Sequence, residues 1–148
     1  MRAYELTESY LYHVTFTKNV SNILKKGLIQ FQPSNWVTGD GDTRYNDEAG
    51  LFAFENSEDA VNWANKTQFD FSDKDVSIIR INPSKLWHQD PSQDVSLRVG
   101  KGRAMRSQKN IDPSDIIDVF DIKQFGNPME RNMSRDEWLQ DVAKVLEK

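Results

Sequence analysis

The sequence predicts an α+β fold, and two patterns along the chain lead to this expectation. Short runs of alternating or β-branched residues, which are typical of strands, stand at residues 10–15, 51–55, 76–81, 95–99 and 117–122. Short amphipathic segments with capping residues at their starts lie between and after these runs, which indicates helices. The strands follow one another too closely and too irregularly for a regular series of strand–helix–strand units, which favours α+β.

Composition limits the class of protein. The chain has 148 residues, of which 37% are hydrophobic and 28% charged, as expected of one globular domain with its own core. No apolar run approaches the roughly 20 residues that span a bilayer, and Met1 to Glu5 lacks the apolar region of a signal peptide. We therefore expect a cytoplasmic protein that is not in a membrane. The absence of cysteine excludes disulfides, thiolate metal sites and thiol nucleophiles.

The first strand and the helix after it hold the most informative residues. The alternation over residues 10–15 places His13 and Thr15 on one face of a strand. A short helix follows, capped by Thr17 or Asn19, and Gly27 provides the left-handed residue that ends it. An imidazole beside a hydroxyl on a buried strand indicates a polar ligand above them. A hydrogen-bonded histidine of the core or the sheet edge is the alternative interpretation of His13.

The remaining elements follow in order. Residues 38–48 are polar and rich in glycine and aspartate, which is typical of a binding loop or lid. The Val/Ile-rich strand 76–81 is expected at the centre of the sheet, and a short helical turn is expected at 84–87. Ser134 to Glu137 form a capping box, which opens an amphipathic helix that docks on its own domain or on a partner.

Charge is unevenly distributed. The net charge is −4, yet one segment without acidic residues carries the five cations Arg98, Lys101, Arg103, Arg106 and Lys109. A basic segment on an acidic protein suits a small phosphate-bearing ligand, and we expect Arg103 or Arg106 to contact its phosphate. A solvated basic loop is the alternative. The sequence offers no metal site, no Gly-rich phosphate loop and no nucleophile elbow.

Several short motifs together carry a family resemblance. They are Leu11-Tyr12-His13-x-Thr15, Ile23-Leu24-x-x-Gly27-Leu28, Gly50-Leu51-Phe52-Ala53-Phe54, a helix with Ala60 and Trp63, and Ile111-x-Pro113-x-x-Ile116. In order and spacing, this set resembles the ADP-ribosyltransferase superfamily, on the side of diphtheria toxin, the poly(ADP-ribose) polymerases and the related RNA 2′-phosphotransferases. The resemblance implies a split pair of small antiparallel sheets gripping NAD within residues 1–122. Residues 123–148 would then be a linker and the C-terminal helix, packed on this domain or on a partner.

The resemblance also implies roles for individual residues. His13 would hydrogen-bond the adenosine ribose of NAD, and Thr15 would lie beside the nicotinamide pocket. Phe52 or Phe54 would form the aromatic wall of that pocket, where the family usually has a tyrosine. The implied function is NAD-dependent transfer of ADP-ribose, a glycosyltransferase reaction, to a protein, nucleic-acid or small acceptor.

The catalytic glutamate of the family is the one part of the pattern that is missing. It should fall near residues 103–107, where the sequence has no acidic residue. The reaction needs a carboxylate to polarise the ribose 2′-hydroxyl and to stabilise the cationic sugar as nicotinamide leaves. Three alternatives follow: another carboxylate substitutes, with Glu48 the first candidate before Glu55 and Asp94; arginines handle phosphates, as in the 2′-phosphotransferases; or the domain binds a nucleotide or partner without catalysis.

Overall fold

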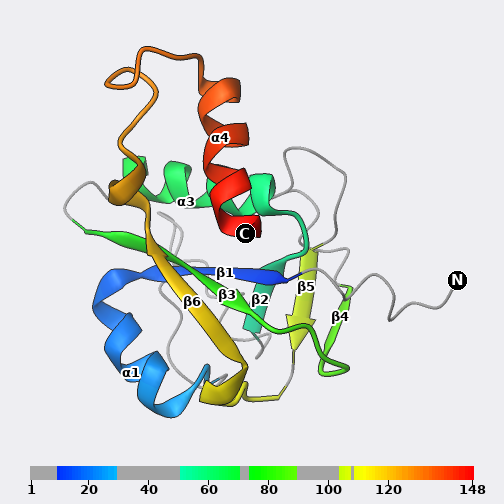
Figure 1. Ribbon diagram of the computed structural model, residues 1–148. Coiled ribbons are helices and arrows are strands. Elements are labelled where there is room, and N and C mark those ends of the chain that lie inside the picture. The colour runs from blue at the N-terminus through cyan, green and yellow to red at the C-terminus, as the bar shows by residue number, and fades with distance from the viewer. Residues whose placement is uncertain (1–9, 30–50, 71–73, 90–103, 108) are drawn as a thin grey trace, which may run out of the picture.

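The computed structural model describes residues 10–29, 51–70, 74–89, 104–107 and 109–148 (Figure 1). Strands and α-helices alternate irregularly along the chain, with short 3₁₀ turns (η) at several junctions. In chain order the elements are β1 (Leu11–Phe16), η2 (Thr17–Asn19), α1 (Val20–Lys26), β2 (Leu51–Phe54), α3 (Ser57–Asp70), β3 (Val76–Ile81), β4 (Trp87–Gln89), β5 (Ala104–Ser107), η4 (Pro113–Asp115), β6 (Ile116–Asp121), η5 (Ile122–Phe125) and α4 (Arg135–Glu147).

The described strands form one antiparallel sheet in the order β4-β5-β2-β1-β3-β6. The α+β class is thus confirmed, and β3 lies inside the sheet, between β1 and β6, as its Val/Ile content predicts. The expected pair of separate sheets is corrected to a single sheet, because the pair Tyr12↔Phe54 joins β1 to β2. The pairing of β1 with β2 consists of this one residue pair, whereas β1 pairs with β3 along its whole length from Leu11 to Phe16. Accordingly, β1 and β2 run across each other in Figure 1.

Alternation along the strands builds a separate core on each face of this sheet. On one face α3 and α4 pack against Tyr12, Val14 and Phe54 (Figure 1). On the other face the core contains Leu11 and Ala53, together with Leu28, Leu51, Ile79, Ile81, Trp87, Met105 and Ile111. Each large apolar side chain that is fully buried contributes about 1.5–3 kcal/mol, so both cores stabilise the sheet.

The C-terminal helix docks on its own domain. The Ser134 side chain accepts a hydrogen bond from the Glu137 amide, and the Glu137 carboxylate accepts one from the Ser134 amide, so the capping box is confirmed. Trp138 is 1% exposed and packs in the core on the α3 side of the sheet. No helix in the described ranges has the length and apolar character to cross a membrane.

Two strands were not expected from the sequence. Residues 104–107 lie in the segment expected to be a basic loop, but the chain forms β5 at Ala104–Ser107. The expected turn at 84–87 is present, with the Trp87 amide donating to the Ser84 carbonyl at 3.3 Å, and β4 follows it at Trp87–Gln89. These strands form because they pair with each other and β5 also pairs with β2, a stabilisation that local residue preferences do not reveal. The expected loop 38–48 and strand 95–99 lie outside the described residues.

Candidate ligand-binding site

A short hydrogen bond fixes the imidazole of His13. Its Nδ1 lies 2.6 Å from the backbone oxygen of Phe52 on the neighbouring strand. Because a carbonyl oxygen only accepts hydrogen bonds, Nδ1 carries the hydrogen and donates it. In the neutral ring Nε2 then has an accepting lone pair, and no described residue hydrogen-bonds this atom.

Burial keeps this ring neutral. Desolvation lowers the pKa of His13 below its ordinary value, and the hydrogen bond to the Phe52 carbonyl opposes that shift only in part. The side chain is nevertheless partly exposed rather than sealed in the core. At neutral pH, His13 therefore presents a hydrogen-bond acceptor of fixed tautomer and not a cation.

Thr15 lies on the same face of β1, two residues further along. It is 4% exposed, and its Oγ1 accepts a hydrogen bond from Asn19 Nδ2 at 3.4 Å. Residues two apart on a strand are separated by about 6.5 Å, so His13 and Thr15 present polar atoms within reach of one small ligand. Asn19 at the start of α1 is thus a polar partner of this site rather than a side-chain cap, since its side chain makes no capping bond.

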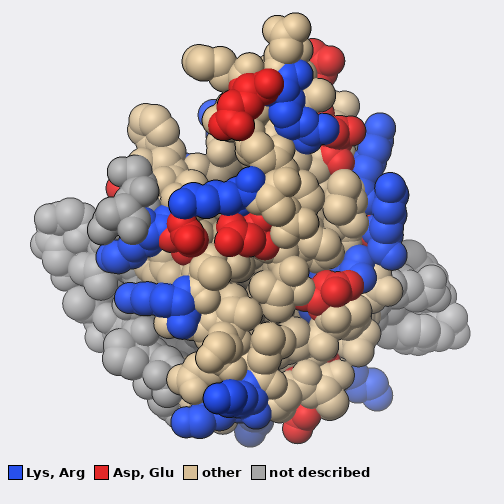
Figure 2. All heavy atoms as spheres, turned by 60° about the vertical axis from the view of Figure 1, so that its left-hand side comes forward, with Lys and Arg blue, Asp and Glu red and all other residues tan. Residues whose placement is uncertain are grey.

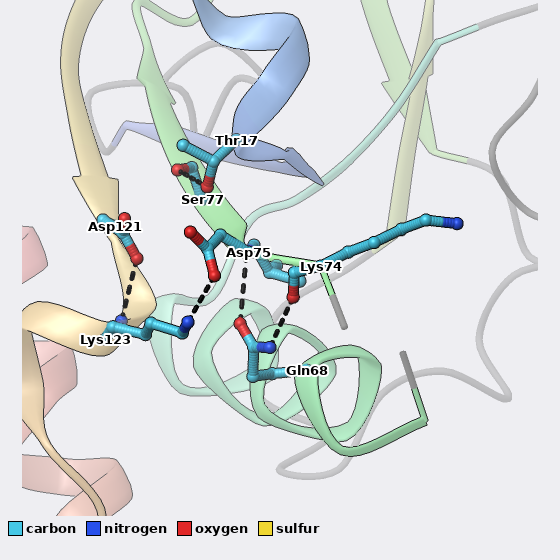
Figure 3. Close-up of polar contacts among 8 residues, drawn as sticks. Thr17, Gln68, Lys74, Asp75, Ser77, Asp121 and Lys123 are labelled. Carbon is cyan, nitrogen blue, oxygen red and sulfur yellow. Dashed lines mark hydrogen bonds and ion pairs between the residues drawn. The ribbon is translucent and has the colours of Figure 1, made fainter. Parts of the chain in front are cut away.

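The turn from β1 into α1 is anchored to the beginning of β3. The Thr17 amide donates to the Asp75 carbonyl at 2.8 Å, and the Thr17 hydroxyl lies 2.7 Å from the Ser77 hydroxyl. Figure 3 shows these side chains together with Lys123, which forms an ion pair with Asp75, and Gln68, which donates to the Lys74 carbonyl. This network holds η2 in place, and so it positions Asn19 beside Thr15.

Phe52 and Phe54 do not line the His13 side of the sheet, so the predicted aromatic wall is wrong. Antiparallel partners share a face, and Tyr12↔Phe54 places Phe54 with Tyr12, on the side that α3 and α4 cover. Phe52, two residues away on β2, shares that side. His13 alternates with Tyr12 and faces the other way. The part of Phe52 that meets His13 is its backbone carbonyl, which no side-chain pattern reveals.

Arg106 also lies on the helix side of the sheet. It pairs in register with Phe52, and its guanidinium carbon is 5.7 Å from the centre of the Phe52 ring. Arg106 therefore does not contact a ligand held by His13, which corrects that expectation. The other two predicted site residues, Glu48 and Arg103, lie outside the described residues.

No protein-family model, curated protein or solved structure matches this chain. We therefore infer a function from the local chemistry. A neutral imidazole acceptor beside a buried hydroxyl suits a ligand with neighbouring hydroxyl groups, such as a ribose.

Proposed function

We propose that this chain is an ADP-ribosyltransferase-like protein that binds NAD on the His13 side of β1. One observation supports this most directly: the 2.6 Å bond from His13 Nδ1 to the Phe52 carbonyl presents Nε2 as an acceptor. A ribose hydroxyl donates to Nε2, and Thr15 contributes the second polar contact. The aromatic wall that the family resemblance implies is not on the His13 side of the sheet, so the ribose contact itself, rather than the resemblance, makes NAD the first ligand to test.

The proposed ligand contacts differ from those that the sequence alone indicates. Neither the Phe52 ring nor the Phe54 ring takes part, and Arg106 stays on the opposite side of the sheet. What remains is a ribose contact built from β1 and supported by the β2 backbone. A partly buried acceptor without a donor is unfavourable, so this contact favours ligands that offer a hydroxyl donor, as a ribose does.

The proposed catalytic group is Glu48. On the His13 face, the described residues of β1, β2 and β5 are Leu11, His13, Thr15, Leu51, Ala53, Met105 and Ser107, so none of these positions carries a carboxylate. Transfer therefore needs an acid from outside β1, β2 and β5. Asp121 of β6 shares this face through the pairs Thr15↔Ser77 and Ser77↔Asp121, and Glu48 lies outside the described residues. The same observation favours a second candidate function, in which the domain binds a nucleotide or a partner without catalysis.

Replacement of His13 by asparagine tests the ribose contact. The amide nitrogen of asparagine stands close to where Nδ1 was, so the bond to the Phe52 carbonyl is retained while the Nε2 acceptor is lost. We expect His13→Asn to keep its melting temperature and to weaken NAD binding at least tenfold in calorimetric titration, roughly 1.4 kcal/mol or more. Wild-type affinity in this variant, or no binding of NAD by the wild type, would overturn the proposal.

Replacement of Glu48 by glutamine tests catalysis. With labelled NAD and a cell lysate, we expect the wild type to transfer label and Glu48→Gln to lower the rate about 100-fold or more at nearly unchanged NAD affinity. Hydrolysis of NAD without an acceptor should be slow. Brisk hydrolysis of NAD that persists in Glu48→Gln would assign the reaction to another residue. Binding of NAD without any transfer or hydrolysis would support the second candidate function, binding without catalysis.

A further inference from the structure

The outer surface of α1 and the turn before it is basic. Residues 17–27 include Lys18, Lys25 and Lys26 and no acidic residue, in a chain with a net charge of −4. All three lysines are exposed. We call them the α1 lysines. Figure 2, in which the side of the molecule that carries α1 comes forward, shows blue side chains along its lower edge.

Ion pairing does not account for this surface. Some other cations of the described structure form ion pairs: Arg80 with Asp118, Lys123 with Asp75 and Arg131 with Asp141. The α1 lysines have no such partner among the described residues. The helix dipole accounts for cations in the last turn of α1, but Lys18 precedes the helix.

Other features of this surface suit an extended polyanion. Lys18 Nζ lies 5.9 Å from the centre of the Phe16 ring, a contact that limits the freedom of its ammonium group. Ser21 and Asn22 are exposed beside the lysines and can donate to phosphate oxygens. Leu24 is 50% exposed, which leaves an apolar contact for a sugar or base.

We propose that the α1 lysines bind the backbone of a single-stranded nucleic acid. A seven-residue helix is about 10 Å long, which matches a few nucleotides of one strand. The Asn19 side chain, at the start of α1, donates a hydrogen bond to Thr15. A nucleic-acid strand bound along α1 would therefore lie next to the proposed ribose contact of His13. Nucleic acid would then be the acceptor in the proposed transfer of ADP-ribose. Its role as acceptor rests on the proposed function, whereas its binding to the α1 lysines does not.

Two triple variants with the same net charge test the proposal. Lys18→Glu, Lys25→Glu and Lys26→Glu together change the net charge by −6, from −4 to −10. Lys85→Glu, Lys144→Glu and Lys148→Glu make the same change at lysines that are also exposed. Because the overall charge is matched, a difference in affinity between the two variants reports the location of binding.

The measurement is fluorescence anisotropy with labelled single-stranded RNA and DNA of mixed sequence. We expect the α1 variant to bind at least tenfold more weakly than the matched control. For three phosphate contacts, the slope of log affinity against log salt for the wild type should be about −2. Equal losses in both triple variants, tighter binding of duplex, or no binding by the wild type at about 50 mM salt would overturn the proposal.

An NAD titration separates this inference from the proposed function. The α1 variant should bind NAD within about twofold of the wild type, because its lysines lie outside the ribose contact. Lysine-dependent RNA binding by a protein that does not bind NAD would overturn only the proposed function. Normal NAD binding with lysine-independent RNA binding would overturn only this inference.

Discussion

At the scale of the residue, the pKa of His13 makes the stability of the fold, and the proposed ligand contact, depend on pH. Its pKa is lowered in the folded protein by desolvation, so folding favours the neutral ring. The unfolded ring titrates near its ordinary value of about 6.5. The stabilisation of the neutral ring is therefore fully present above that pH and is lost as the pH falls through the lower pKa of the folded state. Protonation also removes the Nε2 acceptor.

We expect the free energy of unfolding to decline as the pH falls below about 6.5, and NAD affinity to decline only at lower pH, where the folded ring takes up its proton. Urea unfolding of the wild type and of His13→Asn between pH 5 and pH 8 isolates the histidine, since all other groups are common to both proteins. The wild type should lose more stability than the variant on acidification. Parallel pH profiles would show that His13 does not titrate differently in the folded and unfolded states.

At the scale of the element, the end of α1 depends on Gly27. Its φ angle is +82°, and a Cβ placed there would lie 1.9 Å from the Ile111 backbone oxygen. The next residue, Leu28, exchanges backbone hydrogen bonds of 3.0 and 2.9 Å with Ile111. The glycine thus lets the end of α1 pack against the residues that precede β6.

Gly27→Ala should therefore lower the free energy of unfolding by about 3 kcal/mol or more, through strain and loss of this contact. Gly126→Ala is the matched control, because Gly126 has a φ of +66° but no atom closer than 3.7 Å to an added Cβ. The control should cost less, about 1–3 kcal/mol, because it has a strained backbone without the close contact. Equal costs in urea denaturation would show that close packing at Gly27 has no effect of its own.

At the scale of the whole molecule, Arg80 connects the sheet to the end of α4. Its Nη1 donates to the Leu146 carbonyl at 2.8 Å and its Nη2 to Asp118 at 2.5 Å, and its guanidinium carbon lies 4.5 Å from the centre of the Tyr10 ring. The residue is 7% exposed. The Tyr12 hydroxyl also donates to Leu146, at 3.4 Å, so two strands hold the last turn of the helix.

Arg80→Leu should lower the free energy of unfolding by about 2–4 kcal/mol, because it removes the principal donor to a buried helix carbonyl. Asp118→Asn should cost about 0–1 kcal/mol, because the Asp118 side chain is half exposed. Thermal unfolding of both variants provides the comparison. A similar loss in both would place the stabilisation in the ion pair rather than in the contact with α4.

Local sequence was sufficient to predict several elements. It predicted β1, β2, β3, β6 and the long helices, because alternation, helical periodicity and caps act over a few residues. The capping box at Ser134 and the helix end at Gly27 belong to this group. It also placed His13 and Thr15 on one face, since alternation is a property of the strand itself.

Only the tertiary structure decided which face of the sheet each predicted site residue occupies. Phe52 and Arg106 lie opposite His13 because the register Tyr12↔Phe54 carries the alternation of β1 into β2, and a shift of one residue would reverse every side chain. The strand β5 exists because it has partners on both sides. The same pairing brings the Phe52 carbonyl to the imidazole of His13. The sequence could not predict this contact, because every residue has a backbone carbonyl. Local sequence thus determined that His13 and Thr15 share one face of a strand. Strand pairing determined which residues lie beside them, because register depends on contacts between distant segments.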